Sequence, residues 1–505
     1  MEKLIKIIKE QTGDSKDLII KEYNISNKKM YIVFIETLCD TNSIDEFALS
    51  YFSYIKIHKK VTFNLYKYIK EFIPAHNVKC VNNEKELINY LYYGFAAILI
   101  NKSYYVVEFK RSLDSGINKC ENEKTIKGPK DGFTENYQTN IGLIRKRIRS
   151  DSLWLDEVTI GEKSNTKIGI MYVDGIVDKN KVKEIKEKIS NIKIDSIVAS
   201  NYVYEYLKEN DSLFPSVLST ERPDLVSYKL LSGKIAVIVE NSPFVLLFPA
   251  FFMEFFHTMD DYYQNAKNST YTRIIRIISF VISTMLPGIY IALITYNHEI
   301  IPPELLVNFA MQKDGVPFPT ILEAVFMNIT FEIIRETDTR TPSALGSALS
   351  IVGALVLGDA AVQAGLVSPI MVIVIAITAI SELIFISNDV ANPIKIWRLV
   401  FIFFASISGM IGVFISVILL IAELSSIKSI GYPYLYPLSP FDKDDQGNDS
   451  KPSNPTKPTT PSTKPSNGSN GKNDGKADHE SKYEADTSGS TGRVDSTTAL
   501  KDGVY

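Results

Sequence analysis

The sequence predicts an α/β duplicated soluble N-terminal domain of two similar lobes, followed by a polytopic α-helical transmembrane domain and a disordered C-terminal tail. Three observations lead to this prediction. Short β-rich runs alternate with helix-period segments over about the first 250 residues. Long apolar stretches follow, as far as residue 422. In the predicted tail, 441–505, Lys, Pro, Thr, Ser, Asn and Gly dominate.

Composition excludes several classes of function. The 505-residue chain has a formal net charge of −3, so no excess of base favours a nucleic acid as partner. Its three cysteines, Cys39, Cys80 and Cys120, lack the close spacing of a zinc site or redox dithiol. Nucleotide-binding loops, hydrolase elbows and H-E-x-x-H motifs are absent from the sequence. We therefore expect no enzyme activity, no metal and no cofactor.

The α/β domain is internally duplicated. IVFIETLCDTNSI from Ile32 matches IMYVDGIVDKNKV from Ile170 at an offset of 138, and each predicts a strand followed by a helix start at Asp40 or Asp178. A second pair, GFAAILINKSYYVVEF and GKIAVIVENSPFVLLF, matches at an offset of 139. Two pairs at nearly one offset predict two lobes of similar fold.

The matches place the lobes at residues 1–115 and 165–250, joined by a linker at 116–164 that contains a helix. Thr134 is the predicted N-cap of this helix. Its C-terminal end carries a run of cations, Arg145, Lys146, Arg147 and Arg149. Cations there favour the helix dipole. Alternatively, the run forms a basic stripe that docks on anionic lipid or on a neighbouring subunit.

The transmembrane domain is predicted at residues 251–430. A helix needs about 20 apolar residues to cross the hydrocarbon core. Four segments meet this need, at 277–296, 341–366, 369–387 and 399–422. A fifth, 317–336, is either a span or a re-entrant segment because it contains carboxylates, and we expect it to be re-entrant. Four spans keep the tail in the cytoplasm, and five send it outside.

Charged residues inside these segments are the informative ones, because a charge in a bilayer is costly. Glu323, Glu332 and Glu382 are the intramembrane carboxylates. They either line an ion path or are neutralised by cations of the same region, Arg335, Arg340, Lys395 and Arg398. At 100° per residue, Glu323 and Glu332 lie on roughly opposite helix faces, so both cannot line one pore.

Small residues recur at near-helical spacing in SALGSALSIVGALVLGDAAVQAG. The pattern includes Ser347, Ser350, Gly353 and Ala354, with Asp359 close behind. Such a stripe allows close helix packing. In an oligomer it can also line a narrow pore, with hydroxyls and one carboxylate facing the ions. The spacing leaves both interpretations open.

The motif STERPD precedes the last predicted hairpin of the second lobe. Ser219 or Thr220 is placed to cap a helix that begins near Pro223. The alternative is a hinge or interface at Glu221 and Arg222, between the lobe and the membrane region.

Long ordered motifs carry a resemblance to a known family. LFPSVLSTERPD, SPFVLLFPAFFMEFFHTMDDYY, LPGIYIALITYNHEIIPPELL, DGVPFPTILEAVFMNITFEIIRE and SIVGALVLGDAAVQAGLVSPIMVIVIAITAIS follow one another along the chain. In these segments the sequence closely resembles the A subunits of the GerA-family spore germinant receptors. The resemblance covers about residues 20 to 445. Only the Pro/Thr/Ser tail departs from it.

The resemblance implies a protein of the spore inner membrane that works with a permease-like B subunit and a lipoprotein C subunit. It implies self-oligomerisation, as a pentamer, into a channel for monovalent cations that opens when a nutrient germinant binds. The sequence begins without a signal peptide, so we expect the N-terminal domain on the cytoplasmic side, the spore core. Two alternatives remain: the related stage V sporulation accessory membrane protein, and an ion-coupled solute transporter.

Overall fold

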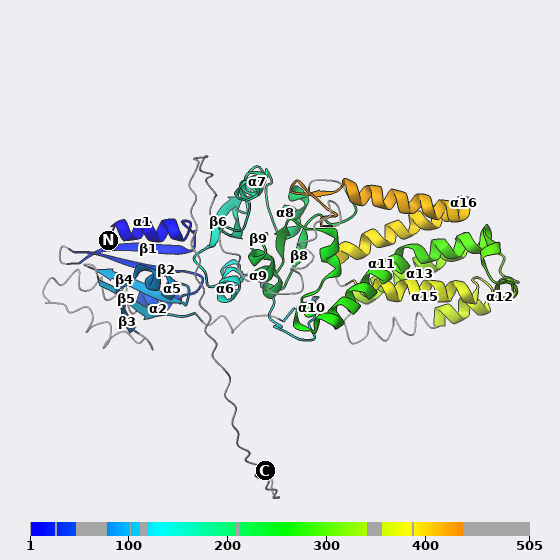
Figure 1. Ribbon diagram of the computed structural model, residues 1–505, viewed down its shortest axis with the longest axis horizontal. Coiled ribbons are helices and arrows are strands. Elements are labelled where there is room, and N and C mark those ends of the chain that lie inside the picture. The colour runs from blue at the N-terminus through cyan, green and yellow to red at the C-terminus, as the bar shows by residue number, and fades with distance from the viewer. Residues whose placement is uncertain are drawn as a thin grey trace, which may run out of the picture. The chain divides into compact units, whose positions relative to one another are not determined.

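The architecture is taken from a computed structural model of the chain, which combines two α/β lobes with a set of apolar helices (Figure 1). The structure describes residues 2–25, 28–46, 78–100, 103–111, 119–120, 122–208, 212–340, 356–385 and 388–437. We call residues 2–111 lobe 1, residues 133–250 lobe 2, and residues 251–426 the helical region.

Lobe 1 contains a five-stranded antiparallel sheet with the strand order β1-β2-β4-β5-β3. Its elements are α1 (Glu2–Gln11), β1 (Leu18–Ile25), β2 (Lys28–Ile35), α2 (Thr41–Ile44), β3 (Val78–Val81), α5 (Glu84–Leu91), β4 (Phe95–Ile100) and β5 (Ser103–Glu108). Leu4 and Ile8 of α1 and Leu87 and Leu91 of α5 are buried in one core with the sheet. Both helices therefore cover the same face.

Lobe 2 repeats this plan with the order β6-β7-β9-β10-β8. Its elements are α6 (Tyr137–Arg147), β6 (Leu153–Ile160), β7 (Thr166–Val173), α7 (Lys179–Ser190), α8 (Ser200–Leu207), β8 (Leu218–Thr220), α9 (Pro223–Leu231), β9 (Ile235–Val239) and β10 (Val245–Phe248). The same strand order in both sheets agrees with the predicted duplication. Asp40 and Asp178 both cap helices, accepting hydrogen bonds from the amides of Asn42 and Asn180.

The predicted boundary between the lobes is wrong. α6 and β6 stand first in lobe 2, as α1 and β1 do in lobe 1. The segment 116–164, predicted as a linker, therefore supplies the first helix and first edge strand of lobe 2. The N-cap of α6 is Asn136, whose side chain accepts a hydrogen bond from the amide of Thr139. Thr134 lies two residues earlier and is not the cap.

The sheet of lobe 2 is buried on both faces. On β7, Ile168 and Ile170 pack in the core with α7 and α8, while Met171 and Val173 pack in the core with α6 and α9. Side chains of a strand alternate between faces, so a strand covered on both sides needs apolar residues at every position. This explains the unbroken apolar runs IGIMYV and IAVIV, and it makes lobe 2 a three-layer α/β/α unit.

The helical region follows β10 through a short aromatic segment that we call the collar, residues 251–263. Its elements are η2 (Phe252–Phe256) and α10 (Met259–Tyr263) in the collar, then α11 (Ala266–Thr295), η3 (His298–Ile300), α12 (Pro303–Lys313), α13 (Thr320–Arg340), α15 (Pro369–Glu382) and α16 (Asn388–Ser426). Among the described residues, Ala266–Thr295 and Asp389–Ser426 are long and apolar enough to cross a membrane.

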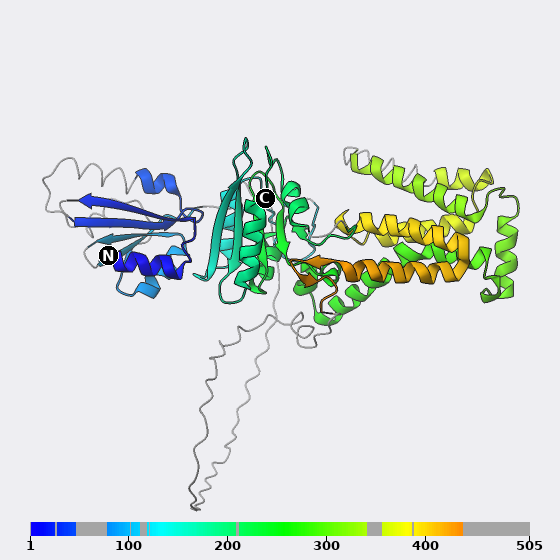
Figure 2. The same ribbon diagram turned by 90° about the horizontal axis from the view of Figure 1, so that it is seen from above.

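α16 is a hairpin of two helices rather than one rod. Gly409 interrupts it with φ 60° and ψ −135°, a backbone conformation open to glycine. Trp397 Nε1 donates a hydrogen bond to Glu423 Oε2 at 2.7 Å, although a straight helix would place residues 26 apart at about 39 Å. Figure 2 shows the two halves side by side. The single segment predicted at 399–422 is therefore two antiparallel halves joined at Gly409.

Two ends of the helical region can be defined from contacts of α11 and α15. In the middle of α11, Phe280 packs against Phe385, which also contacts Phe256 of the collar. Near the end of α11, Tyr290 shares a core with Val367, just before α15. α11 and α15 are therefore antiparallel. We call the end at Phe385 the junction end and the opposite end the distal end.

α13 runs the whole way between these ends. Near its start, Glu323 accepts a hydrogen bond from the amide of Ser368 at 2.8 Å, at the distal end. Near its C-terminus, Arg335 pairs with Glu382, at the junction end of α15. The expected re-entrant segment is therefore wrong, because α13 is one helix of 21 residues.

After α16 the chain returns to lobe 2. β11 (Lys428–Ser429) and β12 (Tyr432–Pro433) form a small hairpin, which we call the C-terminal hairpin. Ile430 at its turn is only 2% exposed and belongs to the core of lobe 2. Ser429 Oγ donates a hydrogen bond to the carbonyl of Ser216 at 2.6 Å and accepts one from the amide of Ala250 at 2.9 Å. Lobe 2 thus holds both ends of the helical region.

Candidate functional site at the junction

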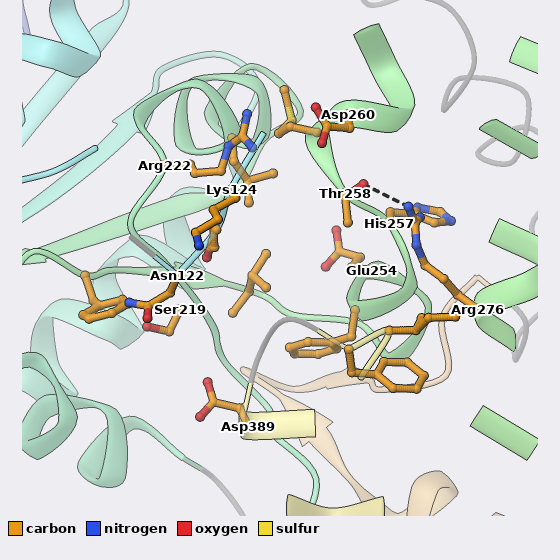
Figure 3. Close-up of a pocket in the computed structure, with 18 of the residues that line it drawn as sticks. Asn122, Lys124, Ser219, Arg222, Glu254, His257, Thr258, Asp260, Arg276 and Asp389 are labelled. Carbon is orange, nitrogen blue, oxygen red and sulfur yellow. Dashed lines mark hydrogen bonds between the residues drawn. The ribbon is translucent and has the colours of Figure 1, made fainter. Parts of the chain in front are cut away.

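A cavity of about 690 Å³ lies where lobe 2 meets the helical region (Figure 3). Its walls come from the loop 122–126, from α8, β8 and β10 of lobe 2, from the collar, and from the junction ends of α11 and α16. Small-molecule sites typically enclose about 300–1,000 Å³. Size and position make this cavity the candidate functional site.

Aromatic side chains form much of the cavity wall. Tyr204 comes from α8, Phe244 from the residues before β10, Phe255 from η2, and Phe385 from the segment after α15. Phe385 is held edge-on against Phe256, with ring centroids 5.7 Å apart. These rings therefore line the cavity from both lobe 2 and the helical region.

Glu254 fixes the collar against lobe 2. Its carboxylate pairs with Lys229 of α9 at 2.6 Å and with Lys234, which precedes β9, and it also accepts the amide hydrogen of Phe251. Burial alone would raise the pKa of Glu254. The charges and hydrogen bonds of the two lysines outweigh burial and lower that pKa to about 2. The carboxylate is therefore ionised and already compensated from outside the cavity.

Arg276 fixes α11 against the collar. Its guanidinium pairs with Asp261 at 2.6 Å and donates to the carbonyl of Phe256 at 2.9 Å and to Thr258 Oγ1 at 3.1 Å (Figure 3). The neighbouring His257 is neutral near pH 7, because burial and then the nearby cations lower its pKa to about 4. The first turns of α11 are thus tied to the collar by a charge-assisted fork.

The STERPD motif holds three segments together at the cavity: its own segment, the loop 122–123 and the collar. Glu221 accepts hydrogen bonds from the amides of Asn122 and Glu123 at 2.7 and 2.6 Å, and Thr220 Oγ1 donates to Glu123 Oε2 at 2.7 Å. Glu221 therefore anchors the loop 122–123 across about 100 residues of sequence. This contact is made to the loop 122–123 and not to the helical region, so the hinge or interface at Glu221 and Arg222 stays a prediction.

The helix that the motif starts is capped differently from the prediction. α9 begins at Pro223, as the sequence indicates, but its N-cap is Arg222 and no side chain makes the cap hydrogen bond. Arg222 instead pairs with Asp224 at 2.6 Å, and Tyr263 of the collar donates to the same carboxylate at 2.8 Å. Capping by Ser219 or Thr220 is therefore wrong.

Glu123 gives the cavity a charge that depends on pH. Burial raises the pKa of its carboxyl to about 7, Glu221 adds to the rise, and the hydrogen bond from Thr220 opposes it. The loop that carries Glu123 thus introduces a group that titrates near neutral pH into the lining of the cavity.

This raised pKa makes stability depend on pH. The pKa of Glu123 lies at about 7 when folded, above its ordinary value of 4.5, so the folded chain binds more protons between these values. Stability should therefore fall as pH rises through 7. We expect Glu123→Gln to be up to about 3 kcal/mol more stable than the parent at pH 8.5, and similar to it near pH 4.

The measurement is the thermal midpoint of the purified full chain between pH 4 and 8.5. Glu187→Gln is the matched control, because Glu187 is an exposed residue of α7 outside the cavity. The control should follow the parent at every pH. Parallel curves for Glu123→Gln and the parent would contradict the assignment.

The predicted basic stripe forms a contact between the lobes. Arg145 is buried and donates to the two carboxylate oxygens of Asp17 at 2.5 and 2.8 Å. Arg149 lies over the ring of Tyr93, 4.9 Å from its centroid. Arg147 pairs with Asp131 at 2.5 Å. Docking of Arg145 on lipid or on another subunit is therefore wrong, because its side chain is buried and paired with Asp17 of lobe 1.

The predicted intramembrane carboxylates at the junction end are neutralised by cations of the same region, which is the second of the two alternatives. Glu382 pairs with Arg335 of α13 and with Arg398 of α16, and Glu332 pairs with Lys395. These residues lie on three separate helices. We call this set the charge cluster.

The remaining predicted positions stand apart from both the cavity and the charge cluster. Glu323 is buried at the distal end, with Lys313 at 3.9 Å. Asp359 is exposed and accepts a hydrogen bond from Gln363 at 2.7 Å. The other pore candidates lie outside the described residues, and the pore assignment stays a prediction; they are Ser347, Ser350, Gly353 and Ala354.

Sequence reasoning missed the cavity. Its lining is gathered from positions 122 to 389, and no local motif connects them. One signal was present in the sequence: the collar, FFMEFFHTMDDYY, concentrates aromatic and charged residues directly after the last strand. Such a segment between two domains is a place where a mixed apolar and polar pocket can form.

Comparison with known proteins agrees with the resemblance read from the sequence. The chain is 37% identical over 439 residues to spore germination protein KA of Bacillus subtilis (strain 168), covering 86% of this chain and 80% of that protein. It is 37% identical over 335 residues to the uncharacterized membrane protein YfkQ of the same organism, covering 66% and 64%.

Among solved structures, the N-terminal domain of the A subunit of the Bacillus megaterium spore germinant receptor GerK3 matches with 32% identity and a TM-score of 0.39. The match covers 49% of this chain and 94% of that one. The family of Bacillus/Clostridium GerA spore germination proteins matches residues 6–456. The chain belongs to the GerA spore germination protein family.

Proposed function

We propose that this protein is the A subunit of a spore germinant receptor and forms an oligomeric, nutrient-gated cation channel in the spore inner membrane. Membership of the GerA family supports a role in spore germination. One relative is named as a membrane protein, and another is described as the A subunit of a germinant receptor. Two physical features of the helical region support the finer assignment.

The first feature is a large apolar surface. Isoleucine, valine and phenylalanine side chains are exposed along the outer faces of the helices, among them Ile277, Val281, Ile329, Ile333, Ile377, Phe403 and Ile418. Soluble monomers rarely expose contiguous apolar patches beyond a few hundred Å². Lipid is the medium that suits this surface. We therefore assign the region as polytopic, with passes in α11, α13, α15 and the two halves of α16, and a sixth pass in the predicted segment 341–366.

The second feature carries the proposal: charges enclosed by that apolar surface. In the charge cluster, Glu382 is only 1% exposed in its side chain and lies between two arginines. Ionised groups within a membrane are retained where they face the interior of a bundle, and they commonly serve ion paths. An apolar exterior with ions inside is the arrangement of a conducting or gated protein rather than of an anchor.

The receptor context completes the proposal. The expected partners are a permease-like B subunit, a lipoprotein C subunit and further copies of this chain, as a pentamer, with membrane lipid around them and monovalent cations passing through. The α/β domain lies on the core side as the regulatory element. Glu221 and Arg222 form the hinge or interface to the membrane region, and the small-residue segment ending at Asp359 lines the pore.

Cysteine substitution tests the pore directly. Cysteine is placed singly at Ser347, Ser350, Gly353 and Ala354, and dormant spores are treated with a small cationic thiol reagent before the germinant is added. We expect K⁺ release to slow several-fold at one or more positions, because a fixed charge obstructs a narrow cation path. Ser425→Cys, exposed in the last turn of α16, is the control. Unchanged release at all four positions would remove this segment from the pore.

A further inference from the structure

We propose that α12 is an interfacial helix, which lies in the lipid surface at the distal end with one apolar side among the acyl chains. The inference rests on the membrane assignment proposed above and goes beyond it, because the connection between two membrane passes need not bind lipid at all. It is carried by the exposure of α12, by its orientation and by the arrangement of its side chains.

No residue of α12 is buried, although more than half of its side chains are apolar. This holds for all eleven residues of the helix, which lie within the described range 212–340. Leu305, Val307 and Met311 are exposed, Met311 to 68%. A helix this short is marginal in water unless it buries an apolar side. α12 therefore needs apolar surroundings that the described residues do not supply.

α12 lies across the distal end of the helical region rather than along it. Seven residues, 296–302, separate it from α11, and six, 314–319, separate it from α13. Figure 2 shows α12 at the right edge, lying across the direction of α11 and α16. The helix is about 16 Å long and cannot cross a hydrocarbon core of about 30 Å. With α11 and α13 crossing the bilayer, α12 is held at the level of the headgroups.

The side chains of α12 are sorted around the helix by polarity. Successive residues are about 100° apart, so Glu304, Asn308 and Gln312 form one polar stripe. Ala310, two residues after Asn308, lies on roughly the opposite side, together with Val307. Both are exposed. A polar stripe opposite exposed apolar residues is typical of a helix that lies in a membrane interface.

A third side of α12 rests on the bundle. Leu306, Phe309 and Lys313 recur at intervals of three and four residues and are the partly covered residues of the helix. Lys313 Nζ donates a hydrogen bond to Thr320 Oγ1 and lies 3.9 Å from a carboxylate oxygen of Glu323. These contacts fix the rotation of α12 about its axis. The polar stripe therefore faces away from the bundle, and the side with Val307 and Ala310 stays open.

Neutral lipid suits this open side better than a charged partner does. The exposed apolar surface continues into the first turns of α13, where Leu322 and Phe326 are exposed. The segment 296–319 contains three carboxylates and one lysine, so it is acidic overall. Anionic headgroups attract basic segments and not acidic ones. Burial of apolar area must therefore hold α12 in the interface.

Spin labels measure the depth of α12 in a bilayer. Val307→Cys, Asn308→Cys, Ala310→Cys and Gln312→Cys are made singly in the full chain, with its three native cysteines replaced by alanine. Each is labelled with a nitroxide in phosphatidylcholine nanodiscs. Power saturation then compares collisions with oxygen, which concentrates among acyl chains, and with an uncharged, water-soluble nickel chelate.

We expect the ratio of oxygen to nickel collisions to be several-fold higher at Val307 and Ala310 than at Asn308 and Gln312. The first two labels should lie about 5–10 Å into the boundary between headgroups and acyl chains. Val307 and Asn308 are a matched pair, because they are neighbours in the chain and differ in the side of the helix that they occupy. Adding phosphatidylglycerol should leave the ratios unchanged. A high ratio at Val307 that requires the anionic lipid would contradict binding through apolar burial.

Two further labels separate this inference from the membrane assignment. Ile418→Cys, at an exposed apolar position of α16, should collide mainly with oxygen, and Glu187→Cys, exposed on α7, mainly with nickel. If Ile418→Cys behaves so while Val307→Cys and Ala310→Cys collide mainly with nickel, α12 lies in water and the inference fails alone. Few collisions with either reagent at these two positions would mean that protein covers them, a second copy or another segment, and would also overturn it. Nickel collisions at Ile418→Cys as well would overturn both.

Discussion

Replacing Arg145 with alanine is expected to lower the free energy of unfolding by about 3–5 kcal/mol. Arg145 is buried and donates to both oxygens of Asp17, and to the carbonyl of Leu153 at 3.1 Å. The substitution leaves the Asp17 carboxylate enclosed without its counter-ion, and this carboxylate is only 4% exposed. The measurement is the thermal midpoint and denaturant unfolding of the purified full chain.

Arg149→Ala is the matched control. It comes from the same cationic run, but its guanidinium lies over Tyr93 at the surface, so we expect a loss of no more than about 1 kcal/mol. The double variant Asp17→Leu with Arg145→Met should recover most of the stability, because apolar residues of similar volume can replace a buried ion pair. Equal midpoints for Arg145→Ala and Arg149→Ala would refute the contact between the lobes.

The second large effect is expected at Glu382. Glu382→Gln removes the carboxylate shared by Arg335 and Arg398, leaving two guanidinium groups among apolar helices. Arg398 keeps its hydrogen bonds to Ser283 and Asn328, which limits the damage. We expect a loss of about 3–5 kcal/mol, the range for breaking one side of a buried pair. The readout is the thermal midpoint of the chain in detergent.

Asp359→Asn serves as the control for this prediction. Asp359 also lies within the helical region, but it is exposed, so its neutral isostere should change stability by no more than about 0.5 kcal/mol. If Glu382→Gln shifts the thermal midpoint no more than Asp359→Asn does, the two arginines do not depend on this carboxylate.

The duplication could be predicted because residues of the same type have the same structural role at equivalent positions of both lobes. Asp40 and Asp178 begin helices after equivalent strands, and these segments keep their spacing. The boundary could not be predicted so easily. EKLIKIIKEQ and YQTNIGLIRKR occupy equivalent places but have little sequence in common, because the second helix uses Arg145 to hold lobe 1. A cation at a helix end gives no sign of whether it is buried.

The sequence predicted which residues form the helical region, but not the direction in which its segments run. Hydropathy measures the length and polarity of a segment, and it carries no information on chain direction. FIFFASISGMIGVFISVILL is uncharged throughout, yet Gly409 in its centre reverses the chain. The charged residues of 317–336 argued for a re-entrant segment, because their partners lie on other helices. Lys395, the partner of Glu332, is 63 residues away.

The C-terminal hairpin ties the end of α16 to lobe 2. Ile430 is inserted in the core of lobe 2, so the residues that directly follow α16 lie beside the α/β domain. If the helices cross a bilayer, they do so an even number of times. A protease site engineered directly after residue 437 should then be protected in sealed vesicles whenever the N-terminus is protected. Because Ser429 after α16 is bonded to Ala250 and Ser216 of lobe 2, a movement of lobe 2 would act on the first and last segments of the helical region at once.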